Sequence, residues 1–199
     1  MSKVVSDQHL SSQGDPEKQG ALLIQLARDA LEAVFSHVVS FASLNGSLAE
    51  SFSEKRGVFV SLWANGAMRG CIGTPFPDQP LGKMIQEFAL KAAFEDSRYL
   101  PVTAEELPKL EIQIILLTSP QPIQPKEIKI GVHGLIVRHI EGIGVLLPDA
   151  IMIEQQWTVR QFLANTCLKG GLHHEAWQDE GTEIYAFETR VIKESQFKA

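Results

Sequence analysis

The chain has few cysteines, no long apolar run and no excess of positive charge. Its two cysteines, among 199 residues, are too few and too far apart for a disulfide framework or a CxxC zinc pattern. The longest aliphatic run, at 114–117, is far too short to span a bilayer. Acidic side chains (24) outnumber basic ones (18), and the bases form no stripe that would favour nucleic acid.

Targeting and cofactor signals are also missing. The first residues contain no apolar segment with a cleavage site, and no glycine-rich phosphate loop follows a predicted strand. We therefore expect a cytoplasmic protein with free thiols and no cofactor, which contacts neither membrane nor nucleic acid. Apolar content of 44% and charged content of 21% are ordinary for one globular domain, or one domain with two lobes.

Three segments show helical patterns. After a polar tail at 1–17, apolar residues recur at spacings of three and four and predict a helix that ends at Asn45-Gly46. A second apolar helical face runs over 81–92. A third helix begins after Thr158, where Gln161 completes a capping box.

Extended segments alternate with these helices. The runs at 57–63 and 67–73 flank Asn65-Gly66, which is the strongest short-range signal for a hairpin. A second hairpin is predicted around Glu141-Gly142, and further strands are predicted at 111–118 and 183–191. Two hairpins mixed with helices predict an α+β fold with antiparallel sheets.

The hexapeptide Met-Arg-Gly-Cys-Ile-Gly at 68–73 is the most informative segment. On a strand, Arg69 and Cys71 would share a face, with Gly70 between them and Gly73 after. A guanidinium beside a thiol favours the reactive thiolate, and the glycines would leave the backbone open to a ligand. The pattern indicates a cysteine nucleophile or covalent carrier whose arginine lowers its pKa or holds an anion. The alternative is a small buried cysteine in an ordinary hairpin, with Arg69 paired to an acidic residue elsewhere.

Other polar residues could complete such a site. His133, between two glycines, is the best candidate for proton transfer, or else a turn histidine bonded to the backbone. Asp96 and Arg98 bracket Ser97, and could either bind a polar substrate or form a local ion pair that fixes the turn. Glu154 is a further candidate to line the site.

No metal is predicted. The adjacent histidines at 173–174 would point in different directions on a helix and are a poor chelating pair. A metal-assisted hydrolase or oxidoreductase that uses His133 with His173 or Glu154 remains an alternative. Cys167, on the apolar face of its helix, is predicted to be structural.

Several motifs in order resemble the AMMECR domain family, over about 20–192. The hexapeptide at 68–73 is similar to the family's Leu-Arg-Gly-Cys-Ile-Gly, with Met68 in place of the leading leucine. The other similar motifs are Ala-Ala-x-x-Asp-x-Arg-aromatic-x-Pro at 92–101, Gly-x-His-Gly at 131–134, Leu-Leu-Pro at 146–148 and Cys-x-Lys-x-Gly-Leu at 167–172.

The resemblance implies two unequal α+β lobes within a domain at 18–199, each with an antiparallel sheet. By this analogy the smaller lobe lies at roughly 74–110, the larger is built from both chain ends, and the hexapeptide faces the cleft between them. Many prokaryotic members are similar to one part of a set that includes a Memo-type and a radical SAM protein, which suggests these as partners. Two functions stay open: a cysteine-dependent enzyme with an unknown substrate, and a non-catalytic binding or adaptor module.

Overall fold

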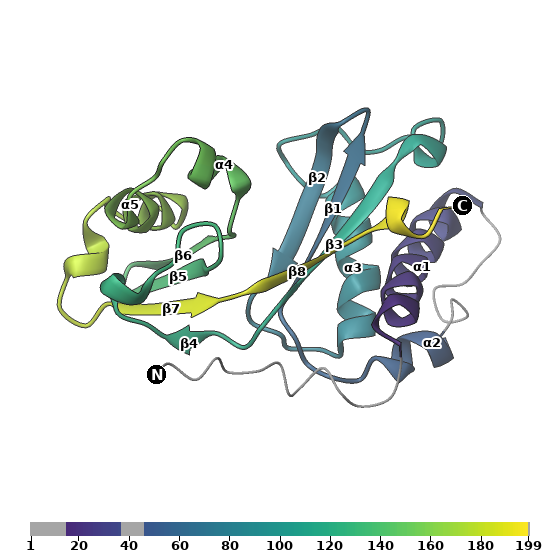
Figure 1. Cartoon of the computed structure of the whole chain (residues 1–199). Coiled ribbons are helices and arrows are strands. Elements are labelled where there is room, and N and C mark those ends of the chain that lie inside the picture. The colour runs from purple at the N-terminus through teal and green to yellow at the C-terminus, as the bar shows by residue number, and fades with distance from the viewer. Residues whose placement is uncertain (1–14, 37–45, 199) are drawn as a thin grey trace.

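The computed structural model describes residues 15–36 and 46–198 (Figure 1). They form helices and two four-stranded antiparallel sheets, which confirms the α+β class. Most of the expected tail at 1–17 and the expected helix end at Asn45 lie outside the described residues. Within the described ranges, no helix has the length and apolar character needed to cross a membrane.

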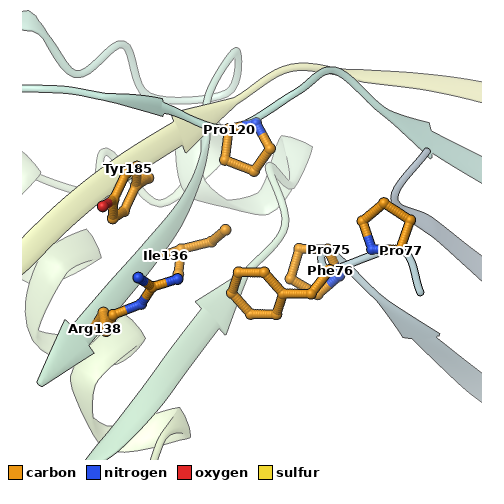
Figure 2. Close-up of a pocket in the computed structure, with 7 residues that line it drawn as sticks. All are labelled: Pro75, Phe76, Pro77, Pro120, Ile136, Arg138 and Tyr185. Atoms are coloured by element: carbon orange, nitrogen blue, oxygen red, sulfur yellow. The ribbon is translucent and has the colours of Figure 1, made fainter. Parts of the chain in front are cut away.

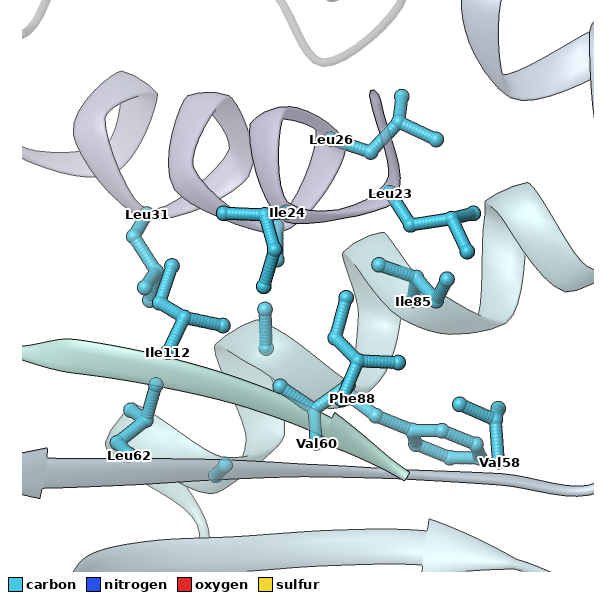
Figure 3. Close-up of a cluster of buried hydrophobic side chains, with 14 of the residues drawn as sticks. Leu23, Ile24, Leu26, Leu31, Val58, Val60, Leu62, Ile85, Phe88 and Ile112 are labelled. Atoms are coloured by element: carbon cyan, nitrogen blue, oxygen red, sulfur yellow. The ribbon is translucent and has the colours of Figure 1, made fainter. Parts of the chain in front are cut away.

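The first lobe is a sheet of strand order β2-β1-β3-β8 with helices on one face (Figure 1). Its helices cover that face because alternate strand residues, such as Val60 and Ile112, are apolar and meet Ile24 and Ile85 of the helices (Figure 3). The elements are α1 (Pro16–Ser36), α2 (Gly46–Ser51), β1 (Val58–Ala64), β2 (Ala67–Thr74), α3 (Leu81–Phe94), β3 (Glu111–Leu117) and β8 (Thr189–Lys193).

The predicted hairpin is confirmed in this lobe. β1 and β2 pair antiparallel, and their turn places Asn65 at φ 52° and Gly66 at φ 78°, in the left-handed region that a two-residue hairpin needs. The hairpin makes β2 an edge strand of the sheet, next to β1 alone.

The second lobe is a sheet of strand order β4-β7-β5-β6, packed against α5. The helix α5 begins as predicted, because the Gln161 N–H donates to Oγ1 of Thr158 at 3.2 Å and the Thr158 N–H donates to the Gln161 side chain at 2.8 Å. The elements are β4 (Gln121–Pro122), β5 (Gly134–His139), β6 (Gly142–Leu146), α4 (Ala150–Glu154), α5 (Val159–Lys169) and β7 (Glu183–Phe187). Short 3-10 helices lie at Leu107–Lys109, Pro125–Glu127, Ala176–Gln178 and Glu194–Gln196.

The lobe boundary differs from the expected one. The segment 74–110 is not a smaller lobe, because its helix α3 buries Met84, Ile85 and Phe88 in the core of the first lobe. This helix connects two strands of one sheet, so its apolar face is buried against that sheet. The second sheet comes instead from 121–187.

The predicted strand at 183–191 is two strands. β7 pairs in the second sheet and β8 in the first, so the chain crosses between the lobes at Glu188 (Figure 1). Thr118 lies beside this crossing, since its N–H donates to the Glu188 carbonyl at 2.9 Å and its hydroxyl accepts from the Glu188 N–H at 2.8 Å. Side chains of both lobes, including Leu117, Ile136 and Phe187, pack together in a small apolar cluster.

Candidate functional site

Cys71 lies on β2, opposite Ser61 of β1. Its backbone N–H donates to Oδ2 of Asp96 at 2.8 Å, and its carbonyl accepts from Nη2 of Arg98 at 3.2 Å. Arg98 also donates to both carboxylate oxygens of Asp96, at 2.6 and 2.9 Å. The side chains of Asp96 and Arg98 therefore satisfy the backbone N–H and carbonyl of Cys71 as a neighbouring strand would. Unsatisfied groups on an edge strand can otherwise pair with a strand of another chain. We name Cys71, Asp96 and Arg98 the edge clip.

Asp96 is the buried member of the edge clip. Its side chain is 4% exposed, whereas that of Arg98 is 58% exposed. Hydrogen bonds from Arg98 hold the pKa of Asp96 well below its usual range despite its burial, and the same pairing raises the pKa of Arg98. The local ion pair, one of the two alternatives for these residues, is thus present, and it also binds β2.

Burial has the largest effect on the pKa of the Cys71 thiol. Burial raises the pKa of Cys71, and the charges of Arg98 and Lys169, which lower it, do not compensate. Lys169 ends α5, so Cys71 is within electrostatic reach of the second lobe. The expected lowering of the thiol pKa by Arg69 is therefore not found.

Arg69 is bound elsewhere. Its Nε and Nη2 donate to the two carboxylate oxygens of Glu106 at 2.9 and 3.0 Å, and Nη1 and Nη2 donate to the Leu100 carbonyl at 3.2 Å. Glu106 also accepts from the Thr103 N–H at 3.0 Å, which is one of the two hydrogen bonds of a capping box. Arg69 thus fastens the segment at 100–106 to β2.

A β-bulge interrupts β2 at Arg69. Leu62 pairs with Gly70 and Trp63 with Met68, so Arg69 has no cross-strand partner. Strict alternation of faces does not hold across an extra residue of this kind.

The glycines of the hexapeptide serve packing inside the protein. A Cβ atom on Gly70 would overlap the carbonyl oxygen of Ala92 in α3. On Gly73 it would overlap the backbone of Val58 and the ring of Phe59. These close approaches, rather than an open path for a ligand, explain why glycine fits here.

His133 and Cys71 lie in different surroundings. Nδ1 of His133 accepts from the Lys129 N–H at 3.2 Å, burial lowers the pKa of His133, and the charges that act on it are those of Glu188 and Lys129. In the part of the chain that the structure describes, no hydrogen bond joins His133 to Cys71. Glu154 is exposed at the end of α4.

The structure also shows the surroundings of His173 and of the second cysteine, Cys167. Nε2 of His173 lies 2.7 Å from Oδ2 of Asp179. Among residues 15–36 and 46–198, no group of three His, Cys, Asp or Glu side chains could hold a metal ion. Cys167 is fully buried in the core of the second lobe, as predicted.

Sequence reasoning missed Glu106 and Lys169 as parts of this region. Glu106 carries a local signal in the sequence, since Thr103 and Glu106 have the spacing of a capping box, but nothing in the sequence links Glu106 to Arg69. Lys169 lies in the last turn of its helix, where the helix dipole is sufficient to explain a cation. Its place in the motif at 167–172 was the only hint of another role.

Comparison with known proteins identifies the family. The AMMECR1 family model matches residues 24–192. The chain belongs to the AMMECR1 family. A Methanosarcina acetivorans protein is 38% identical, over 90% of this chain and 94% of the relative. Protein MJ0810 of Methanocaldococcus jannaschii is 37% identical, over 89% of this chain and 90% of the relative.

A solved structure extends the similarity to the fold. The crystal structure of the uncharacterized protein PH0010 from Pyrococcus horikoshii matches with a TM-score of 0.77 and 35% identity, over 87% of this chain and 90% of that one. In this AMMECR1-family protein the hexapeptide therefore lies on the edge strand of a shared fold. The groups available there are the Cys71 thiol, whose pKa is raised by burial, and the cations Arg98 and Lys169, whose charges lower that pKa.

Proposed function

We propose that this AMMECR1-family protein binds a small anionic ligand beside Cys71, between Arg98 of the first lobe and Lys169 of the second. One observation carries the proposal: Arg98, a cation whose side chain is 58% exposed, is fixed beside Cys71 by the 3.2 Å hydrogen bond from its Nη2 to the Cys71 carbonyl. The charge of Lys169, from the other lobe, also lowers the pKa of this thiol. Carboxylates and phosphates accept strong, charge-assisted hydrogen bonds from such groups.

Arg98 is a prepared donor. Its Nε and Nη2 are held by Asp96 and the Cys71 carbonyl, and Nη1 makes no hydrogen bond to another residue of the described ranges. A guanidinium that is already fixed loses little freedom when it binds a ligand, which favours affinity. Lys169 is exposed and forms no salt bridge with any other described residue, so its ammonium is also available.

The second candidate is a cysteine-dependent enzyme with Cys71 as nucleophile. It is favoured by the same two cations, because both lower the pKa of the thiol. It is the second candidate because burial raises the pKa of the thiol more than the two cations lower it, and the reactive form of cysteine is the thiolate. A non-catalytic module for a Memo-type or radical SAM partner would offer the same cations to an acidic side chain of that protein.

An amide NMR titration with inorganic phosphate tests the binding site. We expect saturable shifts at the Cys71 and Ile72 amides, with sodium chloride of equal ionic strength as the reference. Lys169→Gln should weaken binding about fivefold, because it removes one of two charges. The matched control is Lys126→Gln, another exposed lysine of the second lobe, which should bind as the unmodified protein does. An unmodified protein that shows no phosphate-specific shift at Cys71 would overturn the proposal.

Thiol reactivity separates binding from catalysis. We expect iodoacetamide to label Cys71 half-maximally above about pH 8.5, the ordinary thiol value, because burial raises the pKa of Cys71. Lys169→Gln should move this midpoint higher still, and buried Cys167 serves as the internal reference. Half-maximal labelling near neutral pH would contradict this expectation and would favour the cysteine-dependent enzyme over the anion-binding site.

A further inference from the structure

A pocket of about 260 Å³ lies where the loop after β2 meets the sheet of the second lobe (Figure 2). Its walls are the loop at 75–77, Pro120, Ile136, Arg138 and Tyr185. None of these residues belongs to the edge clip, and Lys169 is not part of the lining. The pocket is therefore a separate site from the one proposed beside Cys71.

The local sequence explains the apolar walls. Leu135 and Val137 of β5 are buried in the core of the second lobe, so the alternate residues Ile136 and Arg138 point to the opposite face of the sheet. Tyr185 of β7 pairs with Ile136 and stands on the same face. Across the pocket, Phe76 is 40% exposed between two prolines that restrict its backbone.

Arg138 is the one charged residue of the lining. Its guanidinium carbon lies 5.8 Å from the ring centroid of Phe76 and 5.5 Å from that of Tyr185, so rings of both lobes flank it (Figure 2). Its acidic partner is Glu183, at 3.5 Å between Nη1 and Oε2, and both side chains are about half exposed, at 47% and 52%. This pairing is loose enough for a ligand carboxylate to replace it.

We propose that this pocket binds a small aromatic acid. Its ring would pack among Phe76, Pro120 and Tyr185, and Arg138 would bind its carboxylate. Apolar walls with one or two placed polar groups are typical of small-molecule sites, and aromatic rings favour contact with other rings. The single cation selects the charge of the ligand, because arginine binds a carboxylate through charge-assisted hydrogen bonds and repels an ammonium.

Three probes test this selection: 3-phenylpropionate, 3-phenylpropan-1-ol and 3-phenylpropylamine. They share ring and chain and differ in the charge of the end group. In amide NMR titrations of the full chain, we expect the acid to shift Phe76, Ile136 and Arg138 and to bind about fivefold tighter than the alcohol, with the amine weakest. Equal affinities for the three probes, or shifts that avoid these residues, would overturn the proposal.

Variants of the lining residues test whether this pocket causes the preference for the acid over the alcohol. Arg138→Gln should abolish the preference for the acid over the alcohol, whereas the control Arg160→Gln, an exposed arginine of the same lobe, should retain it. Phe76→Ala should weaken the binding of both the acid and the alcohol, because both lose contact with its ring, and it should leave a preference for the acid because Arg138 remains. Lys169→Gln should leave all three affinities unchanged. Failure at this pocket is thereby distinguished from failure of phosphate binding beside Cys71.

Discussion

Arg98 and Arg138 are two arginines that lie close to the junction of the lobes and are held very differently. Arg98 donates to both oxygens of a carboxylate that is almost fully buried, with a shortest distance of 2.6 Å. Arg138 reaches a half-exposed carboxylate, that of Glu183, through one nitrogen at 3.5 Å. The difference follows from solvation. A buried carboxylate that loses its partner is left without water to replace it, whereas an exposed carboxylate is solvated by water even without a partner. Arg98 is therefore fixed by the fold and keeps only Nη1 for a ligand, whereas Arg138 can exchange its whole carboxylate partner for a ligand.

The largest expected effect comes from removing the buried carboxylate. Asp96→Ala should lower the free energy of unfolding by about 2–3 kcal/mol, because it leaves the Cys71 N–H and the Arg98 guanidinium without their acceptor. Urea denaturation measures the change. Asp96→Asn keeps an acceptor oxygen for the Cys71 N–H and should lose about half as much. A loss below about 0.5 kcal/mol in Asp96→Ala would show that the edge clip does not stabilise β2.

Acid should reduce this difference. Because the folded-state pKa of Asp96 lies below the unfolded value of about 3.9, its contribution is complete above that pH and declines as the pH falls through the folded value. The stability difference between the unmodified protein and Asp96→Ala should therefore be constant above about pH 5 and smaller at about pH 3. Other carboxylates with lowered pKa values, such as Glu106 and Glu194, are present in both proteins. Their pH-dependent contributions to the free energy of unfolding therefore cancel in the difference. A difference that stays constant down to pH 3 would contradict the role of the Asp96 charge.

Local features of the fold could be predicted from the sequence. The Asn65-Gly66 turn and the Thr158 capping box depend only on residues within a few positions, and both are present. The Asp96–Arg98 ion pair was available as an alternative for the same reason. Its bond to Cys71 was not, because it joins residues 25 positions apart in the sequence.

The features that sequence could not supply depend on register and topology. The bulge at Arg69 appears only when β2 is aligned with β1, and simple alternation therefore does not decide whether Arg69 and Cys71 share a face. The apolar alternation of 183–191 continues across Glu188, although the chain changes sheets there. Gly70 looks like an open backbone position in the sequence, but it is a point of close packing against α3.

The smallest expected effect tests the other arginine. Glu183→Gln should change the free energy of unfolding by less than about 0.5 kcal/mol, because an exposed pair at 3.5 Å gains little over its solvated parts. The same variant should bind 3-phenylpropionate about two- to threefold more tightly, since Arg138 no longer has a competing carboxylate. Urea denaturation and the amide titration measure the two effects on one protein. A stability loss above about 1 kcal/mol would mean that the pair of Arg138 and Glu183 is held as firmly as that of Arg98 and Asp96, and a ligand carboxylate could not replace Glu183.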